Sequence, residues 1–235
     1  MMRKQTYDIV GELIQAIDST FTANSIVDNG LFNYTLPSCN TLWLSVGDIV
    51  TIGGNAYQIT VIIPNVSITV QGTIVLTVKT FVVELPVYRH GTIITTNTEI
   101  KKDNDDGISI TPLIYLREGN GFLKDRMLNR DSPNDRESDL EIYFLKQNDF
   151  SKTEDDIIEF GVIPMRNLLY AFIDVLNKRT DLVGIFDDYT AEDWLRFGFQ
   201  ASDGTKSKYF NVCDMTSCKL NITLNFNKKI ACCTN

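Results

Sequence analysis

The chain has 235 residues, 43% of them hydrophobic, and a net charge of -8 at neutral pH, with a pI near 4.7. This apolar content is enough for the core of one large domain or two small ones. The net negative charge argues against a protein whose main function is to bind nucleic acid, because phosphate binding needs clustered Lys and Arg.

Residues 7–21 are predicted to form the first helix, because apolar residues recur there at steps of three and four. Asp8 and Glu12 interrupt any apolar signal-peptide core at this end of the chain, and no apolar run reaches 18 residues. We therefore expect a protein that is made in the cytoplasm and has no membrane partner.

Residues 24–85 have a different character, because no basic residue lies between Lys4 and Lys79 and because Val, Ile and Thr dominate. Turn residues such as Gly53-Gly54-Asn55 divide the segment into short β-rich runs. The runs are Leu31–Leu36, Ile49–Ile52, Tyr57–Ile63, Val66–Val70 and Thr73–Val83. Short strands at regular spacing predict a small all-β barrel or sandwich.

Four aromatic residues of this segment, Phe32, Tyr34, Trp43 and Tyr57, have the chemistry to stack on bases or sugars. A nucleic-acid groove also needs positive charge, and the segment holds only Lys79. We therefore interpret these aromatics as core or interface residues, and we expect Trp43 and Tyr57 to contact a neighbouring subunit.

Beyond Leu85-Pro86 we expect a strand or hairpin arm over residues 87–96, a polar turn over 101–107 and a strand over 108–116 that has Pro112 at its edge or start. Asp103–Gly107 resembles a calcium-binding loop. The twelfth position of such a loop needs a Glu and holds Ile114 here, so an Asx-rich hairpin turn is the preferred interpretation.

Residues 117–137 are charged, contain Gly and Pro, and lack apolar periodicity, which predicts a long exposed loop. Two interpretations stay open, an arm that contacts a neighbouring subunit and a plain surface loop. Under the first interpretation the contact residues are Arg117, Phe122, Arg126, Arg130 and Arg136.

Residues 138–179 should pair a strand with a long amphipathic helix. Apolar residues alternate from Leu140 to Phe144, the two-residue period of a strand. Ser151 and Glu154 have the spacing of a capping box. The apolar stripe that follows Pro164 must be covered, and it consists of Met165, Leu168, Leu169, Phe172, Ile173 and Leu176.

The C-terminal part predicts an acidic turn over residues 187–193, a strand over 194–201 and a second strand over 220–226, followed by a short tail. In the second strand Leu220, Ile222 and Leu224 alternate with polar residues. One face of that strand is therefore expected to be buried.

The sequence offers no catalytic or metal-binding signature that we find convincing. His90, the single histidine, has no nucleophile near it in sequence, and no phosphate-binding loop or zinc-protease motif is present. We expect neither enzymatic activity nor a cofactor.

The five cysteines, Cys39, Cys213, Cys218, Cys232 and Cys233, are odd in number, which favours free thiols in a reducing compartment. Their spacing does not fit a zinc site either.

If residues 24–85 are set aside, the predicted order is α-β-β-β-α-β-β. This order predicts an α+β protein, an α/β sandwich whose mixed sheet is covered by two helices. The domains would then be residues 1–22 with 86–235 and an inserted β domain over 23–85. An insertion requires its two ends, near Thr22 and Leu85, to lie close together.

Three pieces in this order resemble tail-terminator or tail-completion-like neck proteins of tailed bacteriophages, closest to those of Bacteroidetes and crAss-like phages. They are Thr111–Leu116, Ser138–Leu145 and Val162–Leu168. The resemblance covers residues 1–22 and 86–228 and depends on order and hydrophobic pattern. The β segment departs from it.

The resemblance implies a virion structural protein of the neck, which joins portal to tail as a sixfold or twelvefold homo-oligomeric ring. Its partners would be the portal or other neck and tail proteins, and DNA would pass through the channel without sequence-specific binding. Two alternatives remain, a carbohydrate- or nucleic-acid-binding module that uses the β domain and an inhibitor of a host enzyme.

Overall fold

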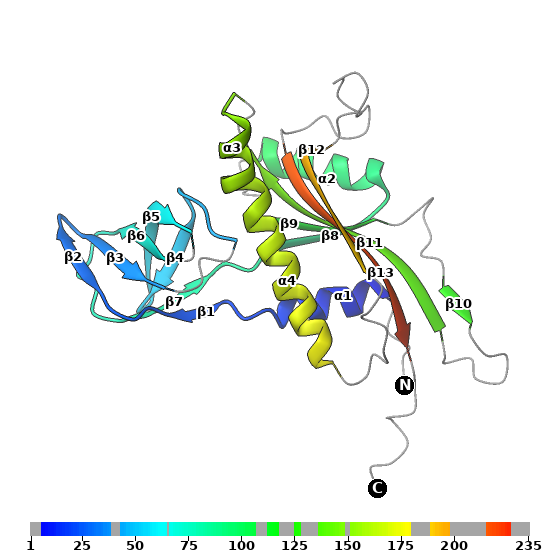
Figure 1. Ribbon diagram of the computed structural model, residues 1–235, viewed down its shortest axis with the longest axis horizontal. Helices are drawn as coiled ribbons and strands as arrows, with labels where there is room; N and C mark the ends of the chain where they lie inside the picture. The colour runs from blue at the N-terminus through cyan, green and yellow to red at the C-terminus, as the bar shows by residue number, and fades with distance from the viewer. Residues whose placement is uncertain are drawn as a thin grey trace, which may run out of the picture. The chain divides into compact units, whose positions relative to one another are not determined.

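The computed structural model describes residues 6–38, 43–64, 66–106, 112–117, 125–127, 136–148, 151–179, 189–197 and 215–226. The chain is a mixed α+β protein, formed mostly by two β-sheets and a few helices (Figure 1). It divides into two compact units. One unit comprises Met1–Ala16 and Pro86–Asn235, and the other, which we call the β unit, comprises Ile17–Leu85.

The β unit holds one curled, seven-stranded antiparallel sheet in the order β1-β7-β4-β5-β6-β3-β2. Its strands are β1 (Thr20–Thr22), β2 (Val27–Gly30), β3 (Asn33–Pro37), β4 (Ile49–Ile52), β5 (Asn55–Ile63), β6 (Ser67–Gln71) and β7 (Thr80–Val83). The strand-rich character expected for this segment is confirmed. Residues 73–79 lie outside β7, so the long run expected over Thr73–Val83 is wrong in its first half.

The concave side of this sheet holds a core of its own. Alternating residues of β3, β4, β5 and β7 are buried, as the two-residue period of a strand requires. The largest of the fully buried side chains are Trp43, Tyr57 and Phe81. Phe21 packs edge-on against Trp43, with 6.4 Å between the ring centroids.

The second unit contains a six-stranded sheet with the path β12-β13-β11-β9-β8, and β10 pairs with β11 beside this path. Its strands are β8 (Val87–Gly91), β9 (Leu113–Arg117), β10 (Asp125–Met127), β11 (Arg136–Gln147), β12 (Thr190–Phe197) and β13 (Met215–Phe226). Its helices are α1 (Thr6–Gln15), α2 (Ile93–Asp105), α3 (Glu154–Ile157) and α4 (Ile163–Lys178), and the π-helical turn η2 (Ile158–Val162) joins α3 to α4.

The pairing of β11 with α4 is the centre of this unit, and both elements are confirmed. Phe144 of β11 meets Phe172 of α4 with 5.9 Å between ring centroids. The whole apolar stripe of α4 is buried. Burial of six such side chains contributes roughly 1.5–3 kcal/mol each relative to exposure, which makes this helix a fixed part of the unit. Figure 1 shows α4 crossing the sheet, and α1 lies beside it.

The opposite side of the sheet is covered by α2, where the expectation was wrong. A strand or hairpin arm was predicted over residues 87–96 and a polar turn over 101–107. The strand β8 ends at Gly91, and the helix α2 follows and links the two parallel strands β8 and β9. Thr92 caps the helix, because its Oγ1 accepts a hydrogen bond from Thr95 N–H at 3.3 Å. Ile100 is buried with Tyr115 and Tyr143, which lie on the sheet face opposite to Phe144.

Several element boundaries also differ from expectation. The first helix ends at Gln15, and Thr20–Thr22 form β1 of the β unit, because the Asp18 carboxylate accepts from Thr20 N–H and turns the chain. The cap of α3 is Thr153, whose hydroxyl accepts from Asp156 N–H, and not Ser151. Thr190–Asp193 belong to β12, although a turn was expected there.

Candidate functional site

Arg117, an expected subunit contact, is engaged within its own sheet. Its Nη1 lies 2.9 Å from the Glu141 carboxylate, which also accepts hydrogen bonds from Tyr143 at 3.3 Å and Lys219 at 3.4 Å. The four side chains come from three adjacent strands and form a polar cluster beside the aromatic core. Burial, followed by the charge of Glu141, raises the pKa of the Tyr143 hydroxyl above its usual value.

The other residues of the expected arm are only partly placed. Arg126 lies in β10 opposite Glu137, and Arg136 lies in β11 opposite Phe226. The stretch predicted as one long loop therefore contains a short strand. Phe122 and Arg130 fall outside the described residues. The arm hypothesis stays a prediction for these four positions.

Trp43 and Tyr57 were expected at a subunit contact, and the structure corrects this. Their exposed fractions are 1% and 2%. Tyr57 is further fixed by its hydroxyl, which donates to the Ile74 carbonyl at 3.0 Å. Burial also raises the pKa of Tyr57 above its usual value. Both residues belong to the core of the β unit. Large aromatic side chains bury much apolar area, which matters most in a small unit.

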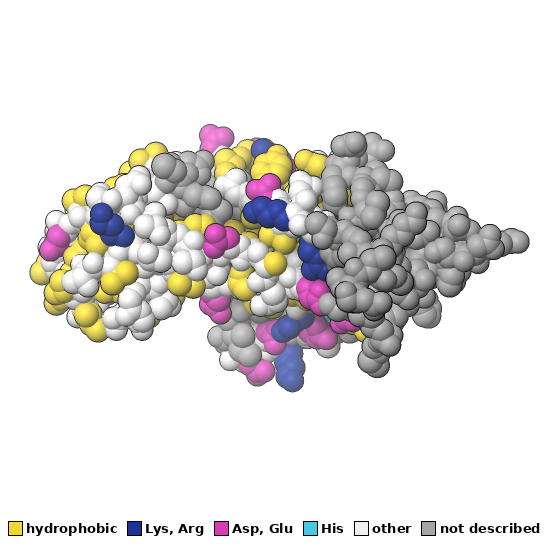
Figure 2. Space-filling model, turned by 90° about the horizontal axis from the view of Figure 1, so that it is seen from below, with side chains coloured by type: hydrophobic (Ala, Val, Ile, Leu, Met, Phe, Trp, Pro, Cys, Tyr) yellow, Lys and Arg dark blue, Asp and Glu magenta, His cyan; other side chains and the backbone are white. Residues whose placement is uncertain are grey.

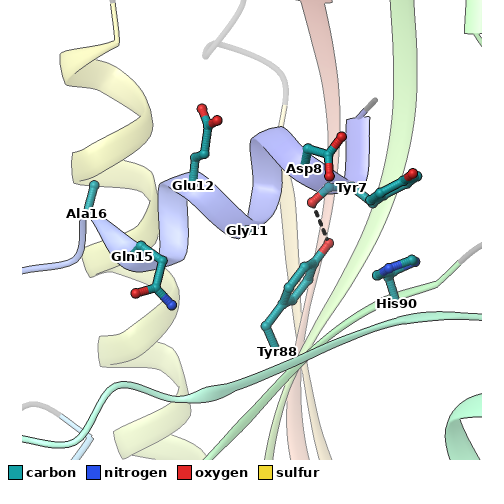
Figure 3. A pocket seen from close by; sticks show the side chains of 8 residues that line it. All are labelled: Tyr7, Asp8, Gly11, Glu12, Gln15, Ala16, Tyr88 and His90. Atoms are coloured by element: carbon teal, nitrogen blue, oxygen red, sulfur yellow. Dashed lines mark hydrogen bonds between the residues drawn. The ribbon is translucent and has the colours of Figure 1, made fainter. Parts of the chain in front are cut away.

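A shallow, open pocket of about 900 Å³ lies between α1 and β8. Figure 3 shows Tyr88 and His90 projecting from β8 toward α1, where Tyr7 and Asp8 lie. The imidazole of His90 stacks on the ring of Tyr7 at 4.4 Å and nearly parallel. The Tyr88 hydroxyl donates to the Tyr7 carbonyl at 3.0 Å.

The chemistry of this pocket fits packing better than catalysis. Its eight described lining residues include no Ser, Thr, Cys or Lys that would act as a nucleophile beside His90. The Glu12 carboxylate forms an ion pair with Arg179, the residue that follows α4, at a distance of 3.5 Å. This contact also holds α1 in place. The tyrosine contacts therefore hold α1 against the sheet, and we assign the pocket no reaction.

Within the described ranges, no three His, Cys, Asp or Glu side chains gather closely enough to hold a metal ion. Cys218, in β13, is a buried free thiol whose pKa is raised by burial to about 11, partly offset by the charge of Arg166. The remaining cysteines lie outside the described residues. A bilayer-spanning helix is absent from the described part of the chain.

The most distinctive surface belongs to the β unit. Twelve of the fifteen exposed large hydrophobic side chains in the described part of the chain lie there. Its charged residues are few and comprise only Lys79, Asp18, Asp28, Asp48 and Glu84. On the face drawn in Figure 2, the β unit at the left shows yellow side chains separated mainly by uncharged white atoms. Apolar exposure of this extent makes the outer face of the β unit the candidate interaction surface.

Sequence reasoning missed the residues that form this surface. The sequence predicts Leu31 and Phe32 at the start of a strand, with the Phe32 ring in the core or at an interface, and Val61 and Ile63 within a strand. The available signal was compositional, because a segment so poor in charge cannot cover its outer face with charged side chains.

Comparison of the chain with protein families, curated proteins and solved structures finds no match.

Proposed function

We propose that the protein is a non-enzymatic structural subunit that assembles with copies of itself into a ring. The observation that carries this proposal is the apolar, charge-poor outer surface of the β unit. Surfaces of this kind are rare on soluble monomers and typical of subunit interfaces, whose centres are depleted of charged residues.

The proposed architecture is an α/β sandwich in which α1 and α4 cover one side of the sheet, with the β unit as an inserted barrel-like domain. Contacts of α4 with β11 and β13, and of α1 with α4 and β8, support it. The helix α2 on the other side adds a partial third layer that a plain two-layer sandwich lacks. The rigid part of the subunit would be the scaffold, and the β unit would carry contacts.

We place the ring in the neck of a tailed phage, of the tail-completion or terminator type, between portal and tail. This placement rests on the resemblance of the three sequence pieces. The acidic balance supports it in one respect, because a channel wall with a net negative charge lets DNA slide without holding it. The proposed location is the virion, with sixfold or twelvefold symmetry and the portal or tail proteins as neighbours.

The alternative, a carbohydrate- or nucleic-acid-binding β domain, gains no support from the aromatic residues. Trp43, Tyr34 and Tyr57 are all buried, and Phe32 alone of the four is exposed. Stacking on bases or sugars requires exposed rings, several of them in most such sites. We therefore prefer the ring.

The ring proposal is tested by measuring mass in solution and imaging the particles. Light scattering after size exclusion should give six or twelve times the 26.6 kDa of one chain, and negative-stain images should show closed rings. Because neck proteins often assemble on a neighbour, the same measurements are made after co-expression with products of the adjacent genes. A monomer under both conditions would overturn the proposal.

A further inference from the structure

The turn between β2 and β3 presents two apolar side chains to solvent. Leu31 is 89% exposed and Phe32 is 45% exposed. The Phe32 carbonyl accepts a hydrogen bond from Gly72 N–H at 3.2 Å, which places the turn beside the segment after β6, where Ile74 and Val75 are 49% and 60% exposed. We call Leu31, Phe32, Ile74 and Val75 the turn patch.

The backbone of this turn adopts a conformation that its residues disfavour. Leu31 and Phe32 have φ values of 52° and 58°, between paired residues Gly30 and Asn33. A two-residue hairpin loop with positive φ at both positions is a type I′ turn, which Asn-Gly suits best. The β4–β5 hairpin of the same sheet has positive φ at the two corresponding positions and uses Gly53 and Gly54. Leu31 and Phe32 therefore occupy two positions that Asn and Gly would adopt with less strain. This choice of residues points to a role for their side chains.

A second apolar surface lies at the other end of β5. Val61 and Ile63, two residues apart on one side of the strand, are 50% and 52% exposed, and Val66 in the following turn is 57% exposed. We call these three residues the β5 patch. The turn patch lies near Tyr57, whose hydroxyl binds the Ile74 carbonyl. Ile63 lies six residue steps beyond Tyr57 along the strand, a distance of about 20 Å.

The distribution of charge indicates a second copy of this chain as the occupant. Two copies each carry a net charge of -8 and repel one another wherever their acidic surfaces meet. The two patches contain no charged residue, so that contact between them brings no like charges together. A basic or acidic partner would find no complementary group on either patch.

We propose that the turn patch of one copy docks on the β5 patch of the next, so that the β units associate head to tail. This inference rests on the proposed ring and specifies its contact. Two different surfaces that meet make a heterologous interface, which closes into a ring when the rotation between copies is a simple fraction of a full turn.

Two double variants test the contact. Leu31→Asn with Phe32→Gly removes the apolar side chains and installs the residues that the turn prefers, so that loss of folding cannot explain a result. Val61→Thr with Ile63→Lys removes the β5 patch and keeps a β-branched residue at position 61. Val82→Thr, on β7, is the control because Val82 is also exposed and belongs to neither patch.

Sedimentation over a range of concentrations should show that the wild type and Val82→Thr assemble. The dissociation constant for self-association of each double variant should be about tenfold higher or more. An equimolar mixture of the two double variants should form a dimer of twice 26.6 kDa and nothing larger. One variant retains an intact β5 patch and the other an intact turn patch, so that only one contact per pair can form.

Rings that persist in the turn variant would overturn the docking contact and leave the ring proposal standing. A wild type that never assembles would overturn both. Equal weakening by Val82→Thr, or a mixture that forms no dimer, would also overturn the head-to-tail contact. So would a turn variant that assembles normally but loses binding to neutral phosphatidylcholine vesicles, because the occupant would then be lipid.

Discussion

The N–H of Val83 donates a 2.8 Å hydrogen bond to the carbonyl of Ser19. Between these two residues lies almost the entire β unit, and the register continues with Thr20 opposite Val82 and Thr22 opposite Thr80. The chain therefore enters and leaves the β unit side by side. An inserted domain requires this closeness of its ends, because the host sheet must continue with little disturbance.

The β unit should consequently fold when it is expressed alone as residues 17–85. It has its own core around Trp43, Tyr57 and Phe81, and each of its strands pairs only with strands of the same unit. We expect cooperative thermal unfolding by circular dichroism and dispersed amide signals by NMR. The reciprocal variant, in which a short Gly-Ser linker replaces 17–85, should keep the helical signal of α4. A fragment without cooperative unfolding would show that the unit depends on the rest of the chain.

The β2–β3 turn should become more stable when its residues match its backbone. Leu31→Asn with Phe32→Gly replaces two residues that disfavour a positive φ, at a cost of about 1–2 kcal/mol each, by two residues that tolerate it better. We expect a gain of roughly 1–2 kcal/mol in the free energy of unfolding, measured with urea. Leu31→Ala is the control, because it removes the exposed side chain and retains the unfavourable φ. A gain of equal size in that control would show that exposure, not strain, limits stability.

The sequence predicts those elements whose side chains follow a strong period. The apolar stripe of α4 and the alternation in β11 and β13 each have one buried face, so that the pattern identifies the element. The sequence of α2 contains three large apolar residues among thirteen, Ile93, Ile94 and Ile100, and Ile100 is buried. A helix with so few apolar residues resembles a polar turn in composition, and the parallel pairing of β8 with β9 is then missed as well.

Residues of the candidate interaction surface were harder to predict than the fold. Arg117 was chosen for its charge and Trp43 for its size, yet cross-strand pairing occupies the first and the core buries the second. Trp43 lies in the connection between β3 and β4, and whether such a side chain is buried depends on how the connection and the curved sheet fold together, which is non-local. Composition indicates an apolar outer face for the segment, but the exposure and positive φ of Leu31 and Phe32 depend on the turn geometry, which composition does not encode.

Gly161 should tolerate a side chain poorly. A Cβ at this position would lie 2.4 Å from Asn148 Nδ2 and 2.6 Å from Thr216 Oγ1, because the π-helical turn η2 passes close to the end of the sheet. Gly161→Ala should therefore destabilise the protein by roughly 1–3 kcal/mol, the usual effect of overpacking. Glu159→Ala, on the exposed side of the same turn, should be nearly neutral in the same urea titration. Equal stability of the two variants would contradict the close approach.

Glu141→Gln should weaken the polar cluster on β9, β11 and β13. The substitution leaves Arg117 and Lys219 near one another without the carboxylate that both contact. Because these groups are partly exposed, solvent screens the effect, and we expect a loss of about 0.5–1 kcal/mol at low salt. Asp139→Asn removes the same charge from the same strand, where the carboxylate binds the Thr223 hydroxyl, and serves as the control. High salt should reduce the Glu141→Gln effect more than the control effect.

Cys218 should not react with alkylating reagents in the native protein. Its side chain is fully buried in β13, and its pKa of about 11 leaves almost no thiolate at pH 8, the species that reacts with alkylating reagents. Peptide mass spectrometry after iodoacetamide should find Cys218 unmodified in the native state and modified in urea. Rapid modification without denaturant would show that β13 opens readily.

The same thiol makes stability fall at alkaline pH. Its pKa is about 11 in the folded state and about 9 when unfolded, so that between these values the unfolded chain has lost a proton that the native chain still holds. The unfolded state is then favoured as pH rises, whereas below pH 9 both states are protonated and the thiol has no effect. Cys218→Ala should be less stable than the wild type near neutral pH, because it removes a buried sulfur, and the difference should shrink from pH 9 to 11. Tyr57 and Tyr143 also have raised pKa values, but they are present in both proteins. A constant difference across this range would assign the alkaline loss to those tyrosines instead.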